Sequence, residues 1–422
     1  MATKVKVPFK VLIIGAGTTG LLLAQGLKQI GIEYQIFERE DASSYKTRPR
    51  EWGMTLHWGT EYISKCIPPH LMERLQEICC DPYYDGQDDT VPHHNGKTGE
   101  LLFAMPGVGI RRVSRRKMRA LFSEGLEINY GKKITTVKRG PDGRGVTATF
   151  EDGSSVSGDL VVGCDGAKSI VRELLVGKDA AQVVPIDIHM FNFTCSYSAE
   201  TSRFLRMRHP ILKNSYHPDF NTMFLLTIQD VPSPSAPEAW KYQLFMSWAG
   251  APRPEDFPDQ ASRLAFFKSR AEHWAEPWRT AALEVPDDIN FPTDRCSMWT
   301  PSSSWSESPF AGVVTIAGDA AHPMPPFRGQ GLNNALQDAT QLVEQLQTVA
   351  AGEKTLAEAM QAYEDEMRQR ACEEIPISLK QAQMVHNFDT LMQSPMVKLG
   401  LHKAKDAEKM MQQQQHQQTD TS

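Results

Sequence analysis

The chain has 422 residues, enough for more than one domain, and its 41% hydrophobic and 23% charged residues are ordinary for a globular protein. Its net charge of -6 provides no positive field, which argues against a nucleic-acid-binding protein. The seven cysteines form no Cys-x-x-Cys pair, so we expect neither a disulfide framework nor a metal site, and no apolar run reaches the roughly 20 residues that span a bilayer. These features favour a cytoplasmic protein without a transmembrane segment.

The N-terminal region is predicted to form a strand, a glycine loop, a helix and a second strand. Residues 11–14 are an apolar run, and apolar residues then keep helical spacing as far as Ile30. Gly31 marks the end of this helix, and residues 34–38 form the next strand. The pattern is that of a βαβ unit.

Two further apolar strands are predicted far along the chain. A small β-meander over residues 133–157 leads to a strand at 159–163, and another strand covers 313–317. A helix with apolar positions at helical spacing over 332–346 follows the last one. We expect the three strands to be buried and parallel, so that each delivers its loop to one edge of a sheet.

The glycine loop after the first strand has the pattern Gly15-x-Gly17-x-x-Gly20. Between a strand and a helix, such glycines permit a tight turn, close approach of the backbone to a pyrophosphate, and close packing of helix on strand. Glu38, at the end of the second strand, is placed to accept hydrogen bonds from the ribose hydroxyls of an adenosine. The first unit therefore predicts a dinucleotide site, with a structural turn as the alternative.

Two more motifs carry a family resemblance. GDAAHPMPPFRGQGLN, at residues 318–333, and DGAKSIVR, at residues 165–172, occur with the glycine loop in an order and spacing that cover most of residues 10–345. Together they resemble the class A FAD-dependent monooxygenases, the aromatic hydroxylases similar to para-hydroxybenzoate hydroxylase. The resemblance implies non-covalently bound FAD, with NAD(P)H as a transient electron donor and dioxygen and a small molecule as substrates; a second copy of the chain is a candidate partner.

The physical chemistry of the third motif agrees with a flavin. Asp319 can accept a hydrogen bond from the ribityl chain, and the backbone N–H groups of 329–333 can face the pyrimidine edge of the ring. Pro325 and Pro326, which lack N–H groups, can form an apolar wall. The cofactor-binding residues we predict are Gly15, Gly17, Gly20, Glu38, Arg50, Arg115, Asp165, Asp319, Pro326, Gly329, Gly331, Leu332 and Asn333.

Several of these assignments have alternatives. Arg50 and Arg115 suit phosphate oxygens, but Arg48 and Arg116 are close rivals, and a solvated charge is the other reading for each. Asp165 resembles the family's residue near the pyrophosphate and, with Arg172, the nicotinamide path; an Asp-Gly turn is also common without any ligand.

The fold class expected is α/β: a discontinuous Rossmann-like FAD-binding domain, an inserted strand-rich substrate domain and C-terminal helices, the first of which follows a Thr-Leu-Ala-Glu capping box at Thr355. Our boundaries are 8–65, 101–185 and 295–350 for the FAD-binding domain, 66–100 and 186–294 for the substrate-binding domain, 351–409 for the helical region and 410–422 for a disordered glutamine-rich tail.

The function that the resemblance implies is hydroxylation or epoxidation of a small hydrophobic or aromatic substrate through a flavin hydroperoxide, in secondary metabolism or aromatic catabolism. His57 and Tyr216 are candidates to take a proton from a phenol or enol, with a structural role as the alternative for each. The other functions considered are a flavin-dependent reductase or dehydrogenase on the same scaffold and a non-catalytic flavin-binding protein. The second is disfavoured because Asp319 and the 329–331 loop are both present.

Overall fold

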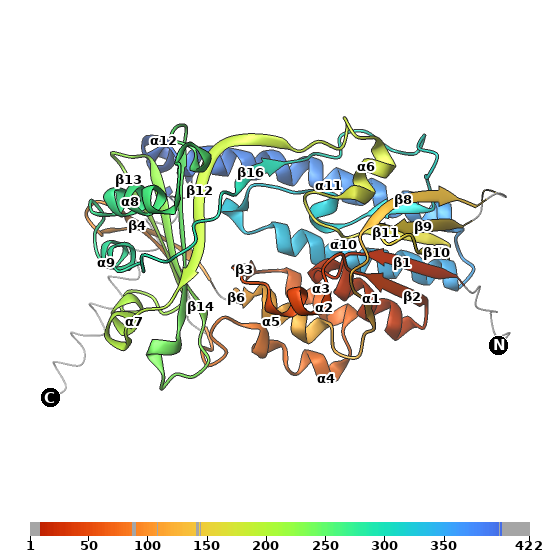
Figure 1. Cartoon of the computed structure of the whole chain (residues 1–422), viewed down its shortest axis with the longest axis horizontal. Helices are drawn as coiled ribbons and strands as arrows, with labels where there is room; N and C mark the ends of the chain where they lie inside the picture. Colours follow the sequence, from red (N-terminus) through yellow and green to blue (C-terminus); the bar gives the residue numbers. More distant parts are fainter. Residues whose placement is uncertain are drawn as a thin grey trace. The chain divides into compact units, whose positions relative to one another are not determined.

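The computed structural model describes residues 9–86, 90–107, 109–140, 143, 145–395 and 397–398, so the predicted tail at 410–422 lies outside them (Figure 1). The chain divides into two compact units. Unit 1 comprises residues 1–79, 113–186 and 297–379, and unit 2 comprises 80–112, 187–296 and 380–422. Residues 66–79, expected in the substrate domain, thus belong to unit 1, and 101–112, expected in the FAD-binding domain, belong to unit 2.

Unit 1 is built on a five-stranded parallel sheet. Its order is β17 (Val314–Ile316), β11 (Leu160–Gly163), β1 (Lys10–Ile14), β2 (Glu33–Phe37) and β7 (Ile128–Asn129). The three apolar strands predicted from the sequence, β1, β11 and β17, are adjacent and fully buried along most of their length. Their carboxyl ends therefore bring three loops from distant parts of the chain to one edge of the sheet, which confirms the predicted fold class.

Two long helices of unit 1 position those loops. α1 (Thr18–Ile30) begins at the glycine loop and ends at Gly31, whose φ is 70°. α10 (Gly331–Ala350) packs against α1 so closely that a β-carbon at Gly26 would lie 2.5 Å from a methyl group of Val343. α11 (Leu356–Val385) starts at the predicted capping box, in which the Thr355 and Glu358 side chains each accept the other's backbone N–H.

The remaining elements of unit 1 are short. The antiparallel meander β10–β9–β8 was predicted from the sequence, and β3 pairs with β6. The bounds are α2 (Ala42–Thr47), β3 (Gly53–Leu56), α3 (Gly59–Cys66), α4 (Pro69–Met72), η1 (Leu75–Ile78), β6 (Arg111–Ser114), α5 (Arg115–Phe122), β8 (Ile134–Arg139), β9 (Val146–Phe150), β10 (Ser155–Gly158), α6 (Ile170–Val176), η4 (Gly318–Ala320) and η5 (Pro326–Arg328).

Unit 2 contains a seven-stranded mixed sheet in the order β16–β12–β15–β14–β13–β4–β5. An aromatic-rich core packs between one face of this sheet and the helices α8 and α9. The bounds are β4 (Thr90–Asn95), β5 (Leu101–Pro106), β12 (Val184–Cys195), α7 (Ala199–Leu205), β13 (Leu212–His217), β14 (Thr222–Asp230), η2 (Pro237–Ala239), β15 (Lys241–Ala249), η3 (Pro254–Asp256), α8 (Gln260–Ala271), α9 (Trp278–Leu283), β16 (Arg295–Met298) and α12 (Phe388–Gln393). Within the described ranges, every helix is too short or too polar to cross a membrane.

Candidate functional site

The three glycines of the first loop serve different purposes. Gly15 has φ +112°, and a β-carbon there would lie 2.4 Å from the Cys164 carbonyl oxygen; one at Gly20 would lie 2.1 Å from the Gly15 oxygen. The fold itself therefore excludes side chains at these two positions. Gly17 is different, because its φ of -74° suits any residue and a β-carbon would meet nothing closer than 3.9 Å. The space over Gly17 suits a ligand that approaches the backbone.

The same loop presents hydrogen-bond donors. The cap residue of α1 is Gly17, which has no side chain to satisfy the first N–H groups of the helix. A helix start of this kind favours a phosphate group. Glu38 is buried beside the loop, and its carboxylate accepts the N–H groups of Ala16 at 3.0 Å and Glu40 at 3.1 Å. Its remaining lone pairs stay available for ribose hydroxyls.

Two of the four candidate arginines form ion pairs within unit 1. Arg48 pairs with Glu40, and Arg116 lies 3.9 Å from a Glu51 carboxylate oxygen. The guanidinium of Arg115 instead stacks 4.5 Å from the Trp52 ring centroid, and burial together with nearby arginines lowers its pKa to about 10. A partly buried cation whose pKa is lowered by burial and by two neighbouring arginines fits an anionic ligand. The structure therefore favours Arg115 over Arg116 as the contact to a phosphate group.

Arg50 also lies near this tryptophan, with its guanidinium carbon 5.3 Å from the Trp52 ring centroid. Sequence reasoning missed Arg119, which is buried, stacks 3.6 Å from the Tyr45 ring centroid, and adds a positive charge to this region. Tyr45 in turn donates its hydroxyl to the Ala16 carbonyl oxygen at 2.7 Å, so it ties the arginines to the glycine loop.

Asp319 follows β17 in unit 1. Its side chain is exposed, yet the surrounding protein desolvates the carboxyl group and raises its pKa. A carboxylate in such a place fits the hydroxyl groups of a ribityl chain.

The N-terminus of α10 lies beside Asp319, since a β-carbon at Gly331 would lie 3.9 Å from one of its carboxylate oxygens. The buried Asn333 amide is engaged within the protein: its oxygen accepts the N–H groups of His57 and Gly59, and its nitrogen donates to the Thr55 and Gly329 carbonyl oxygens. The predicted cofactor contact of this residue therefore rests on its backbone. The helix cap Gln330 makes no capping bond with its side chain among the described residues, which leaves the first N–H groups of α10 for a ligand.

The remaining residues of this loop are partly accessible. Pro326 is exposed, and Gly329, with φ +64°, and Leu332 are half-buried. His57 is close, because a β-carbon at Gly329 would lie 3.6 Å from its Nε2 atom. The structure thus brings His57 together with the predicted flavin-facing loop.

The Asp-Gly motif has a structural role. The Asp165 carboxylate caps α6, accepting the N–H groups of Ile170 at 2.7 Å and Val171 at 3.2 Å. Arg172 is buried and donates to the carbonyl oxygens of Ala167, Ala181 and Ala320. A guanidinium used in this way is not available to a passing nicotinamide, so the reading of Arg172 as part of that path is not supported.

Tyr216 lies in unit 2, on β13. Its hydroxyl is 2.8 Å from His93 Nδ1, and both rings are buried and stacked with Phe103. Burial raises the pKa of Tyr216 well above its ordinary value and lowers that of His93 to about 3, so both groups are neutral near pH 7.

Other possible sites do not coincide with these residues. A cavity of about 520 Å³ opens at the end of α6 and is lined by Trp299, Trp305 and several serines, and none of the predicted cofactor residues borders it. Across the described ranges, no group of three or more His, Cys, Asp or Glu residues is placed to hold a metal ion.

The parallel sheet, the open backbone at Gly17, the starts of α1 and α10 without a side-chain cap and the accessible Asp319 fit a dinucleotide-binding flavoprotein fold. The chain belongs to the FAD binding domain family, whose model matches residues 8–57 and 105–375. It is 37% identical to the FAD-dependent monooxygenase phnB of Penicillium herquei over 92% of this chain and 94% of the relative, and 35% identical to cctM of Talaromyces islandicus over 93% and 96%. The protein is an FAD-dependent monooxygenase.

Solved structures share the fold at low identity. A 2,6-dihydroxypyridine-3-hydroxylase from Arthrobacter nicotinovorans is 17% identical with a TM-score of 0.70, covering 90% of this chain and 94% of that one. HpxO of Klebsiella pneumoniae, complexed with FAD and uric acid, is 20% identical with a TM-score of 0.70 over 92% of each chain.

Proposed function

We propose that this monooxygenase hydroxylates a hydrophobic aromatic compound of secondary metabolism in the cytoplasm, with NAD(P)H as electron donor. The observation that carries the proposal is that the open backbone at Gly17 and the accessible carboxylate of Asp319 follow two strands of one parallel sheet, β1 and β17, which flank β11. A reducing compartment fits the seven cysteines, all of which are free thiols. The named ring substrates of the two structural neighbours support an aromatic substrate class.

The residues of unit 1 would hold FAD along its length. The N-terminus of α1 and Arg115 suit the pyrophosphate, Glu38 the adenosine ribose, and Asp319 the ribityl chain. The first N–H groups of α10, from Gly331 onward, suit the pyrimidine edge, where they would stabilise negative charge. Bound FAD supplies the redox chemistry, accepting hydride from NAD(P)H and reacting with dioxygen, while the protein binds, orients and excludes water.

We assign proton transfer to His57 rather than Tyr216. Burial lowers the pKa of His57, so the imidazole is neutral at neutral pH and is able to accept a proton from a phenol. It lies against the Gly329 loop, where a substrate beside the flavin would be within reach. The hydroxyl of Tyr216 is occupied by His93, and its raised pKa keeps it protonated near neutral pH, so it does not accept a proton.

The test uses the purified full-length protein. We expect a yellow flavin spectrum, and an aromatic compound that accelerates NAD(P)H oxidation with matching dioxygen uptake; oxidation of NAD(P)H without dioxygen uptake would instead indicate the reductase. His57→Asn should lower turnover with phenolic substrates and change its pH profile, while His70→Asn, at an exposed site on α4, should not. A colourless protein that binds no added FAD would refute the proposal.

A further inference from the structure

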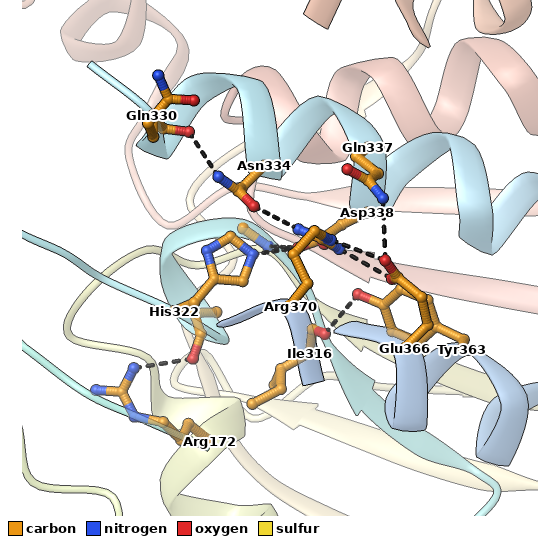
Figure 2. Close-up of polar contacts among 12 residues, drawn as sticks. Arg172, Ile316, His322, Gln330, Asn334, Gln337, Asp338, Tyr363, Glu366 and Arg370 are labelled. Carbon is orange, nitrogen blue, oxygen red and sulfur yellow. Dashed lines mark hydrogen bonds and ion pairs between the residues drawn. The ribbon is translucent and has the colours of Figure 1, made fainter. Parts of the chain in front are cut away.

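The loop that carries Asp319 is attached to α10 through one buried carboxylate. Asp338 of α10 is fully buried, and its Oδ2 atom accepts the Gly318 N–H at 2.7 Å and lies 2.6 Å from His322 Nε2. Its Oδ1 atom accepts Arg370 Nη2 of α11 at 2.6 Å (Figure 2). A single side chain thus joins the loop after β17 to two helices.

Arg370 extends these contacts to the first turn of α10. Its Nη1 atom donates to Asn334 Oδ1 at 2.7 Å, and its Nε and Nη2 atoms donate to the two carboxylate oxygens of Glu366 (Figure 2). The fork of the guanidinium therefore holds three side chains at once, which a point charge would not do.

Asp338 is ionised in this setting. Burial alone would raise its pKa, but the interactions with His322 and Arg370 outweigh that effect and lower the pKa to about 2. Because an ionised carboxylate only accepts hydrogen bonds, the Nε2 atom of His322 must carry the proton between them. Removing such a charge leaves its buried partners uncompensated, and this lowers stability more than removing one partner of an exposed ion pair does.

The network holds the two groups that we assign to the flavin. Gly318, held by Asp338, precedes Asp319 directly, and its φ of +63° places it where a β-carbon would lie 2.5 Å from Thr19 Oγ1. Asn334, held by Arg370, follows the N–H groups that open α10. Burial is the main cause of the raised pKa of Asp319, and the charge of Asp338 adds to it, so the field of Asp338 reaches that carboxyl group.

We propose that Asp338 is a positioning residue for FAD: through His322 and Arg370 it sets the direction of Asp319 and of the α10 N-terminus, and its charge contributes to the reduction potential of the flavin. This inference rests on the flavin contacts proposed above. The carboxylate touches the protein alone and acts on the cofactor through the loop and the helix.

The test compares Asp338→Asn with Asp365→Asn, a matched control at an exposed carboxylate on α11. We expect Asp338→Asn to raise the Kd for FAD about tenfold or more, since misaligned contacts lose affinity steeply. At saturating FAD, the flavin bound to Asp338→Asn should have a more positive reduction potential than the flavin bound to the wild type, because the substitution removes a negative charge that would oppose electron addition. The control should match the wild type in both measurements.

Arg370→Lys keeps the charge but loses the fork, so its Kd for FAD should lie between those of the wild type and Asp338→Asn. This variant carries the test if Asp338→Asn does not fold. A Kd for FAD equal to that of the wild type, or a raised Kd with an unchanged reduction potential of the flavin, would overturn the proposal, because the network would then have a structural role alone. A wild type that binds no FAD would instead refute the proposed function.

Discussion

Replacement of Gly17 by alanine separates what the fold needs from what the cofactor needs. The backbone at Gly17 has φ -74° and ψ 179°, which alanine adopts without strain, and the added methyl group would lie 3.9 Å from the nearest atom. Without FAD, the variant should therefore be as stable as the wild type or more stable by about 0.4–1 kcal/mol, because alanine restricts the unfolded chain.

With FAD, the same methyl group should weaken binding. It would stand where the pyrophosphate approaches the N-terminus of α1, and each charge-assisted hydrogen bond lost there costs about 1.5–3 kcal/mol. At about 1.4 kcal/mol per factor of ten, the Kd for FAD should rise about tenfold to a hundredfold. Urea denaturation of the apoprotein gives the stability, and quenching of flavin fluorescence during titration gives the Kd.

Gly15→Ala is the matched control. With φ +112° and a β-carbon 2.4 Å from a carbonyl oxygen, this variant should lose stability even without FAD. If Gly17→Ala bound FAD as tightly as the wild type, the loop would not be the pyrophosphate site. If it lost apoprotein stability as Gly15→Ala does, our explanation of this glycine would be wrong.

Three further substitutions test single groups. Arg115→Gln should leave the apoprotein as stable as the wild type or more so, because it removes a guanidinium whose pKa is lowered by burial and by neighbouring arginines, yet weaken FAD binding by about 1.5–3 kcal/mol; thermal melting with and without FAD would detect this, and equal FAD-induced shifts would contradict it. Burial raises the pKa of Glu364 to about 7, so the wild type should lose stability as the pH rises from the ordinary carboxyl range through 7, and Glu364→Gln should be more stable than the wild type by about 2–3 kcal/mol at pH 8 but not at pH 4. Urea unfolding measures this, and a difference in unfolding free energy that does not change between pH 4 and pH 8 would contradict the prediction. Tyr216→Phe leaves His93 Nδ1 without its hydroxyl partner and should lower the unfolding free energy by about 1–3 kcal/mol with FAD binding unchanged; a weaker affinity for FAD would contradict the structural role.

The sequence predicted the parts of the fold that depend on local pattern. The apolar strands and the glycine loop are contiguous signals, so three buried parallel strands that deliver their loops to one edge could be predicted, whereas the order β17, β11, β1 was found only in the structure. The choice between Arg115 and Arg116 did not follow, because it depends on which side of a turn faces Trp52 and which faces Glu51. Neighbouring residues with the same charge carry no such information.

The network around Asp338 was not predicted because its members lie far apart in the chain: Arg370 is 32 positions from Asp338. A signal was nevertheless present. Asp338 lies three and four positions from Ala335 and Leu342 on the apolar stripe of α10, and Arg370 is three positions from the buried Met367. An ionisable residue on an apolar stripe must find a partner, so two such residues on consecutive helices predict a buried pair.

The residues of unit 1 can be sorted by whether the protein itself explains them. Gly15 has an internal reason, since its backbone conformation and the Cys164 carbonyl oxygen forbid a side chain. Gly17, Arg115 and Asp319 have none of that kind: a glycine with open space above it, a partly buried cation, and an accessible carboxylate that the surrounding protein desolvates each cost stability or leave it unimproved. A folded chain retains such features where a ligand compensates for them. Open backbone at Gly17, a cation at Arg115 and a hydrogen-bond acceptor at Asp319 together match the pyrophosphate and the ribityl hydroxyl groups of a flavin dinucleotide. It follows from this division that Gly17→Ala and Arg115→Gln should each leave the stability of the apoprotein unchanged or raise it, while each lowers the affinity for FAD.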